Sequence, residues 1–165
     1  MRKLRHLLLL LCLSISLVGC GERPVKTDVD MLDVITRELN LNVTVQKTGT
    51  IDLDEVVLVS YMTGNEYQEH TYGYAEFEKQ KNNYKFIRIY PMMERGQDLR
   101  SAIYNDSYLF VVNNDNCKSL RISRVNGKTN SITVDQIPFI YYLENALDSN
   151  FEYQFLNKDG KEIYP

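Results

Sequence analysis

Histidine, cysteine and tryptophan are scarce in this sequence. Its 165 residues include two histidines, three cysteines and no tryptophan. A stable zinc site uses three or four ligands, usually histidine or cysteine, so this composition argues against one. The eight glycines are scattered and form no phosphate-binding loop. No serine stands in a Gly-x-Ser-x-Gly motif. We therefore expect no catalytic residue, no cofactor and no metal.

The longest apolar run is too short to cross a membrane as a helix. It extends from Leu7 to Val18, which covers about 18 Å of helix against a hydrocarbon core of about 30 Å. Three basic residues within the first five positions precede the run, and small residues follow it. This arrangement is typical of a secretory signal. We expect residues 1–19 to direct export and then to be removed.

The end of the apolar run, Leu17-Val18-Gly19-Cys20, resembles the lipobox of bacterial lipoproteins. The resemblance implies that the Cys20 thiol receives a diacylglyceryl group and that a peptidase cuts between Gly19 and Cys20. It also implies attachment to the extracytoplasmic face of the cell membrane. Gly21 in place of an aspartate would permit sorting to the outer membrane in a Gram-negative cell. The alternative is an ordinary secretory signal, or an uncut anchor, in which Cys20 has no role.

Removal of the signal changes the charge and the cysteine content of the chain. The segment carries three basic residues and no acidic one, so its loss leaves 146 residues and changes the net charge from −3 to −6. An acidic domain of this size is a poor candidate for binding nucleic acid. Cys117 then remains alone beside the lipid site, so no intramolecular disulfide is expected. We interpret Cys117 as a small packed side chain rather than a reactive thiol.

A helix is predicted at residues 28–39, where apolar residues recur with helical spacing. Thr27 and Asp30 form a variant of the capping box at its start, and Asn40 is a plausible end. Residues 20–27 in front of the helix would be a lipidated tether that reaches at most about 27 Å. The domain is therefore expected to work near the membrane surface.

After Asn40 the apolar pattern changes to that of β-strands. The continuous apolar run at 56–61 indicates a central strand, and Asn82-Asn83 and Asn126-Gly127 indicate hairpin turns. Residues 139–147 fit either a helix or a strand. Short connections predict antiparallel pairing. Strands are predicted near 43–47, 56–61, 72–78, 84–90, 108–112, 119–123 and 132–134, at 151–155, where three aromatic rings share one face, and at 162–164.

These elements predict an α+β domain over residues 28–165, with one N-terminal helix packed on an antiparallel β-meander or sandwich. Pro138 would end or border a sheet because proline cannot donate a ladder hydrogen bond. In an alternative division, residues 138–165 form a small β unit of their own.

Two groups of polar residues could carry chemistry, but each has a simpler interpretation. Glu66, Glu69 and His70 could supply metal ligands if their loop curled, but a polar hairpin loop is the favoured interpretation. Asp52, Asp54 and Glu55 could supply paired carboxylates, but spacing within a loop does not establish how far apart two carboxylates lie, and a solvated loop is the favoured interpretation.

Six tyrosines gather around three adjacent predicted strands. An exposed row of them could bind a glycan or a protein, because tyrosine joins a flat apolar ring to a polar tip. Tyrosine also has high strand propensity, so packing within the domain is the favoured interpretation. They are Tyr61, Tyr67, Tyr72, Tyr74, Tyr84 and Tyr90.

The sequence thus predicts a lipid-anchored cell-envelope protein, a non-enzymatic binding or interaction module held at the membrane through Cys20. Its partner would be an envelope protein or a glycan. The domain itself is only weakly similar to small Gram-positive lipoproteins. The alternative is a small envelope enzyme whose pocket combines tyrosines with charged groups such as Asp54, Glu76 and Arg88.

Overall fold

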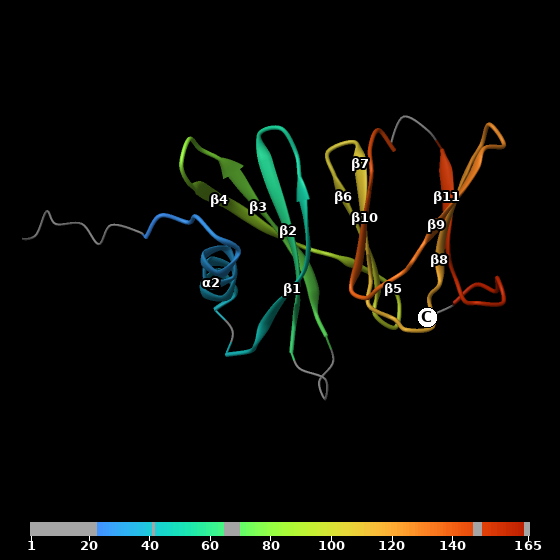
Figure 1. Cartoon of the computed structure of the whole chain (residues 1–165), viewed down its shortest axis with the longest axis horizontal. Helices are drawn as coiled ribbons and strands as arrows, with labels where there is room; N and C mark the ends of the chain where they lie inside the picture. The colour runs from blue at the N-terminus through green and yellow to red at the C-terminus, as the bar shows by residue number, and fades with distance from the viewer. Residues whose placement is uncertain (1–22, 41, 65–69, 147–149, 164–165) are drawn as a thin grey trace, which may run out of the picture.

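The chain forms four layers, a helix followed by three antiparallel sheets (Figure 1). The computed structural model describes residues 23–40, 42–64, 70–146 and 150–163. We name the sheets A, B and C in order from the helix. Their strand orders are β1-β2-β3-β4 in sheet A, β10-β7-β6-β5 in sheet B and β11-β8-β9 in sheet C.

The helix α2 spans Asp28–Leu39, as predicted. The strands are β1 (Val45–Asp52), β2 (Val56–Thr63), β3 (Tyr72–Lys79), β4 (Tyr84–Pro91), β5 (Met93–Gly96), β6 (Leu99–Tyr104), β7 (Ser107–Val112), β8 (Ser119–Arg124), β9 (Thr129–Thr133), β10 (Phe139–Leu143) and β11 (Phe151–Leu156).

The α+β prediction is wrong, because the described part of the chain is mainly β. One helix of 12 residues accompanies three sheets. The sequence pattern did not predict β5 and β6, and it left β10 undecided between helix and strand. Sheet B is buried on both faces, so β6 and β7 lack the alternation of apolar and polar residues that marks a half-exposed strand. The helix covers one sheet face only, and the sheets cover one another.

The start of α2 follows the predicted capping box. The Thr27 side chain accepts a hydrogen bond from the backbone N–H of Asp30 at 3.2 Å. The Asp30 carboxylate in turn accepts from the backbone N–H groups of Lys26 and Thr27, at 2.9 and 2.8 Å. These hydrogen bonds lower the pKa of Asp30. At the other end Asn40 takes a left-handed conformation with φ 49° and ends the helix.

Alternate residues of the central strands point to different cores. In β2, Val57 and Val59 face the helix, whereas Leu58 between them faces sheet B. In β7, Leu109 faces sheet A and Phe110 faces sheet C. Three apolar cores therefore lie between the four layers, and the continuous apolar run of β2 is central in its sheet, as predicted.

Sheets A and B meet at both of their long sides. On one side only Met92 separates the end of β4 from the start of β5, so the chain passes directly from sheet A to sheet B. On the other side β1 lies against β10, where Gly49 closely approaches the Ile140 side chain. The strands after Pro138 belong to two sheets, because β10 pairs with β7 and β11 pairs with β8.

Replacement of Gly73 in β3 by alanine is expected to reduce the free energy of unfolding by about 2 to 3 kcal/mol. A Cβ atom at this position would lie 2.6 Å from Tyr61 Cζ and 2.8 Å from the backbone oxygen of Tyr90, which cannot move without shifting β4. Gly49→Ala is the matched control, with a smaller expected loss because only the Ile140 side chain stands in the way. Chemical denaturation of both variants measures the difference, and equal losses would contradict the argument.

Candidate functional site

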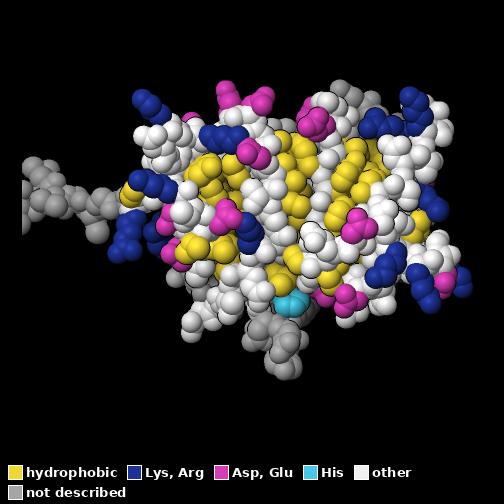
Figure 2. Space-filling view, in the orientation of Figure 1, with side chains coloured by type: hydrophobic (Ala, Val, Ile, Leu, Met, Phe, Trp, Pro, Cys, Tyr) yellow, Lys and Arg dark blue, Asp and Glu magenta, His cyan; other side chains and the backbone are white. Residues whose placement is uncertain are grey.

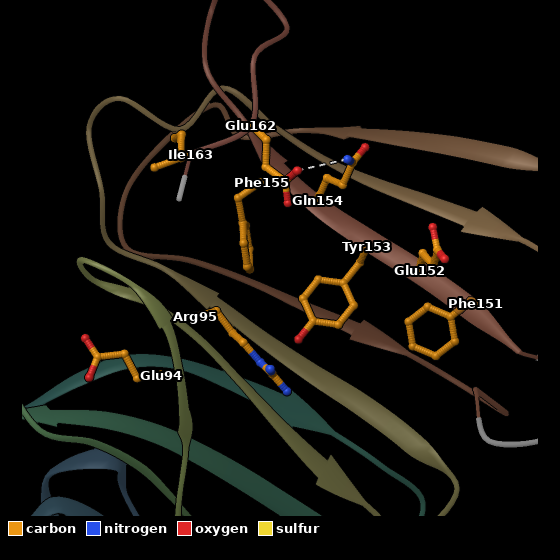
Figure 3. A pocket seen from close by; sticks show the side chains of 9 residues that line it. All are labelled: Glu94, Arg95, Phe151, Glu152, Tyr153, Gln154, Phe155, Glu162 and Ile163. Carbon is orange, nitrogen blue, oxygen red and sulfur yellow. Dashed lines mark hydrogen bonds between the residues drawn. The ribbon is translucent and has the colours of Figure 1, made fainter. Parts of the chain in front are cut away.

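A groove of about 540 Å³ lies between β5 and β11, at one side of sheets B and C (Figure 3). We call it the β5–β11 groove. Both strands stand at the edge of their sheet, so the groove follows two strand edges. Its lining residues are Glu94, Arg95, Phe151, Glu152, Tyr153, Gln154, Phe155, Glu162 and Ile163.

The side chains of β11 alternate between the two faces of sheet C. Figure 3 shows Phe151, Tyr153 and Phe155 projecting toward sheet B, whereas Glu152 and Gln154 project the other way. The shared face of the three aromatic rings is confirmed and follows from the two-residue repeat of a strand. The groove therefore has an aromatic inner wall and a polar outer rim.

Arg95 connects the two walls of the groove. Its Nε donates a hydrogen bond to Ser101 Oγ at 3.1 Å, and its guanidinium carbon lies 5.7 Å from the centre of the Tyr153 ring. The hydroxyls of Ser101 and Tyr153 are 3.1 Å apart and share a hydrogen bond. A cation placed over an aromatic ring is attracted by its π face. The guanidinium is thus held against the aromatic wall.

The aromatic rings of the groove already have aromatic neighbours. The Tyr153 ring lies edge-to-face with Phe110 at 4.9 Å between centroids, and the Phe151 ring lies edge-to-face with Tyr108 at the same separation. Together with Arg95 these contacts occupy Tyr153 on more than one side. The rings therefore form a packed wall rather than a free stacking platform.

The rim of the groove carries more negative than positive charge. Its three carboxylates, Glu94, Glu152 and Glu162, face one guanidinium. Glu162 accepts a hydrogen bond from Gln154 Nε2 at 3.0 Å, and Glu94 lies 3.6 Å from Nη2 of the buried Arg100. Glu152 is exposed and forms no ion pair with any described residue. This part of the rim can therefore attract a cationic group.

A second hollow, of about 610 Å³, brings together Asp54 and Glu76, two residues of the alternative enzyme hypothesis. Glu76 is 8% exposed and its carboxylate accepts hydrogen bonds from Arg88 Nε at 3.1 Å and from the Tyr104 hydroxyl at 3.1 Å. The Tyr90 hydroxyl is a third, longer donor at 3.5 Å. Glu76 thereby links β3, β4 and β6, and we interpret it as a structural link between sheets A and B.

The tyrosines around Glu76 remain protonated far above neutral pH. Burial and the hydrogen bond to Glu76 raise the pKa of Tyr104 to about 12. Burial also raises the pKa of Tyr74 to about 12, and the Tyr74 hydroxyl donates to the backbone oxygen of Ile103 at 2.9 Å. Both groups therefore act as hydrogen-bond donors that join the two sheets.

The described residues of the two predicted polar groups lie in different places, although Asp54 and Glu55 line the same hollow as Glu76. His70 Nδ1 lies 3.0 Å from the backbone oxygen of Thr63, while Glu66 and Glu69 lie outside the described residues. Asp52 pairs with Lys79. Within the ranges that the structure describes, no three histidine, cysteine or acidic side chains gather as a metal site would require.

Cys117 is 1% exposed, and its thiol lies 3.7 Å from the backbone oxygen of Ser119. Burial raises the pKa of this thiol, which disfavours the reactive thiolate. These facts agree with the interpretation of Cys117 as a packed side chain.

The predicted tyrosine row is packed inside the domain. Tyr61, Tyr72 and Tyr74 are buried, and Tyr84 and Tyr90 are half-buried. Tyr61 packs toward the helix, whereas Tyr72 and Tyr74 pack between sheets A and B. This confirms the packing interpretation for the five described members; Tyr67 lies outside the described residues. The sequence did not predict the β5–β11 groove, although the aromatic repeat of β11 was a signal of one of its walls.

The predicted lipid site and the comparisons with known proteins give no further residue assignments. Gly19 and Cys20 lie outside the described residues.

On the face shown in Figure 2, acidic and basic side chains are interspersed. The chain matches no protein-family model, no curated protein and no solved structure.

Proposed function

We propose that this chain is a lipid-anchored binding protein of the bacterial cell envelope, attached through Cys20, and that its partner binds in the β5–β11 groove. The sequence Leu17-Val18-Gly19-Cys20 after a short apolar run supports the anchor. The observation that carries the binding role is the groove itself, which combines an open rim of charged groups with a rigid aromatic wall. Among the described residues that line it there is no histidine, cysteine or serine.

The layered fold separates the groove from the start of the domain. Val25 is buried against the helix side of sheet A, where its backbone oxygen accepts a hydrogen bond from Tyr84 at 2.7 Å. From Cys20 to Val25 the chain can reach at most about 18 Å. An anchor at Cys20 would hold α2 and sheet A close to the bilayer. The groove, between sheets B and C, would then lie farther out and open to other envelope components (Figure 1).

Among the described residues, no helix combines the length and the apolar character needed to cross a bilayer. The proposal assigns attachment to acyl chains on Cys20, and two or three such chains hold a protein stably.

Cys20→Ala is expected to abolish lipid attachment and signal removal when the full chain is expressed in a bacterial host. The thiol of Cys20 is the proposed acceptor of the diacylglyceryl group, so alanine leaves no atom to modify. Metabolic labelling with a radioactive fatty acid, together with the intact mass of the purified protein, measures both steps. The matched control is Cys12→Ala, which lies in the segment expected to be removed and should label normally. Normal processing and tight membrane association of Cys20→Ala would contradict the proposal.

A further inference from the structure

The outer edge of β11 has backbone groups without partners in the described part of the chain. β8 pairs with the inner edge of β11 along its whole length. On the outer edge, the backbone oxygen of Phe155 accepts a hydrogen bond from Ile163 at 2.8 Å. Successive residues of a strand direct their backbone groups to alternate sides, so those of Tyr153 and Phe151 point to this same outer edge. No backbone hydrogen bond from a described residue reaches these two from that side.

We propose that this open edge of β11 binds an extended peptide segment of a partner protein, which adds to sheet C as a further strand. The proposal rests on the proposed function and names the class of its partner. An exposed strand edge is a template for pairing with another chain. In strand addition, main-chain hydrogen bonds supply affinity and side-chain pockets supply specificity. The β5–β11 groove of about 540 Å³ lies beside this edge and gives the added side chains room.

The two faces of the groove determine the side chains that the partner should carry. An added strand would direct alternate side chains inward, beside Phe151 and Tyr153, and outward, beside Glu152. The inner neighbours are half-buried rings, which favour apolar side chains. The outer neighbour is an exposed carboxylate without an ion-pair partner among the described residues, with Glu162 also on the rim. The partner segment should therefore alternate apolar and basic residues.

The same contacts argue against a glycan in this groove. Sugar rings bind to the exposed flat faces of aromatic side chains. Here the Tyr153 ring contacts Phe110 and the Arg95 guanidinium, and the Phe151 ring contacts Tyr108. Among the described residues, no backbone group pairs with the outer edge at Phe151 and Tyr153, and a backbone edge recognises another backbone.

A synthetic peptide of about ten alternating valine and lysine residues is the probe. It is titrated against the mature lipidated protein in phosphatidylcholine nanodiscs and followed by fluorescence anisotropy, with empty nanodiscs as the blank. We expect saturable binding that is at least about tenfold tighter than that of the valine–glutamate peptide of the same length. Hydrogen exchange should slow at the amides of Phe151 and Tyr153. It should stay unchanged at Glu152 and Gln154, which already pair with β8.

Two matched comparisons separate strand addition from simple charge attraction. Every second amide of an extended peptide points to the same edge, and only one edge of the peptide would pair with β11. N-methylation of the amides on that edge should abolish binding, whereas N-methylation of the intervening amides should leave binding intact. Glu152→Lys should weaken binding of the lysine peptide about three- to tenfold. Glu55→Lys, the same charge change in the hollow of sheet A, should have no effect.

Absence of peptide binding, equal effects of the two methylated peptides, or unchanged exchange at Phe151 and Tyr153 would overturn the proposal. A concentration-dependent dimer that protects the same two amides would assign the edge to a second copy of the chain and would also overturn it. The intact mass of the same preparation reports lipid attachment at Cys20. Peptide binding by a protein that lacks the lipid would contradict the anchor and support strand addition. Lipid attachment without peptide binding would contradict strand addition alone.

Discussion

Phe110→Ala is expected to lower the free energy of unfolding by about 3 to 5 kcal/mol, the largest loss from any single substitution considered. The Phe110 side chain is completely buried at the centre of the core between sheets B and C. Its ring lies 4.9 Å from that of Tyr153 and 6.3 Å from that of Phe155, both on β11. Truncation removes these contacts and leaves a cavity that a layer of paired strands cannot close. Urea denaturation of the purified domain measures the loss.

The control for this substitution is Val125→Ala, at a side chain that is 81% exposed. Its free energy of unfolding should stay within about 0.5 kcal/mol of the original protein. A loss below about 1 kcal/mol for Phe110→Ala would contradict the presence of a packed core between sheets B and C. It would also weaken the argument for a rigid aromatic wall in the β5–β11 groove, because Phe110 supports that wall from behind.

The second large effect is a loss of stability at alkaline pH. Burial raises the pKa values of Tyr61, Tyr74 and Tyr104 from 10.0 to about 12, and it also raises the pKa of Tyr72. In the unfolded chain these groups lose their protons near pH 10, whereas in the folded domain they keep them to about pH 12. Their stabilising contribution is therefore complete below about pH 10 and is lost as the pH rises toward 12.

The size of this loss of stability follows from the difference in the number of protons bound by the folded and the unfolded protein. Each group contributes about 1.4 kcal/mol per pH unit above pH 10, so the four groups together give a slope of about 5 to 6 kcal/mol per pH unit. A domain with an ordinary stability of about 5 to 15 kcal/mol would then approach unfolding before pH 12. Denaturation curves at several pH values, combined with the absorbance of tyrosinate, measure the slope and the protonation together.

Tyr61→Phe is the matched control for the alkaline effect. No hydrogen bond joins the Tyr61 hydroxyl to another described residue. Removal of this hydroxyl should leave the free energy of unfolding near neutral pH within about 1 kcal/mol of the original protein and reduce the alkaline slope by about one quarter. A free energy of unfolding that is the same at about pH 8 and about pH 11 would contradict the prediction, as would tyrosinate formation by all tyrosines near pH 10 in the folded protein.

Elements with local signals could be predicted from the sequence. The helix at Asp28–Leu39 depends on a capping box and an apolar repeat within a few residues, and both signals lie in the segment itself. The strands β2, β3 and β4 follow from long apolar or aromatic runs separated by turn residues. Antiparallel pairing follows from short connections, which cannot join parallel strands.

The fold class could not be predicted in the same way. β5 and β6 contain Glu94 and Arg100, and the short polar β5 carries no periodic signal. Arg100 is nevertheless buried, because its guanidinium binds the backbone oxygens of Gly96 and Leu99 and lies over the Tyr72 ring. Gly96 belongs to β5 and Tyr72 to β3, so two of these partners come from other strands, and the residue type alone predicts exposure.

The sequence by itself therefore determined the helix, most strands, their antiparallel pairing and the lipobox-like segment ending at Cys20. Only the tertiary structure decided that three sheets stack on one another, that the tyrosines lie between layers, and that β5 and β11 meet along the groove. The physical reason is the range of the forces involved. Helix capping and strand alternation act within a few residues. The order of the layers depends on which apolar faces bury one another, and those faces come from segments far apart in the sequence. The groove lies where the edge strands of sheets B and C, β5 and β11, come together.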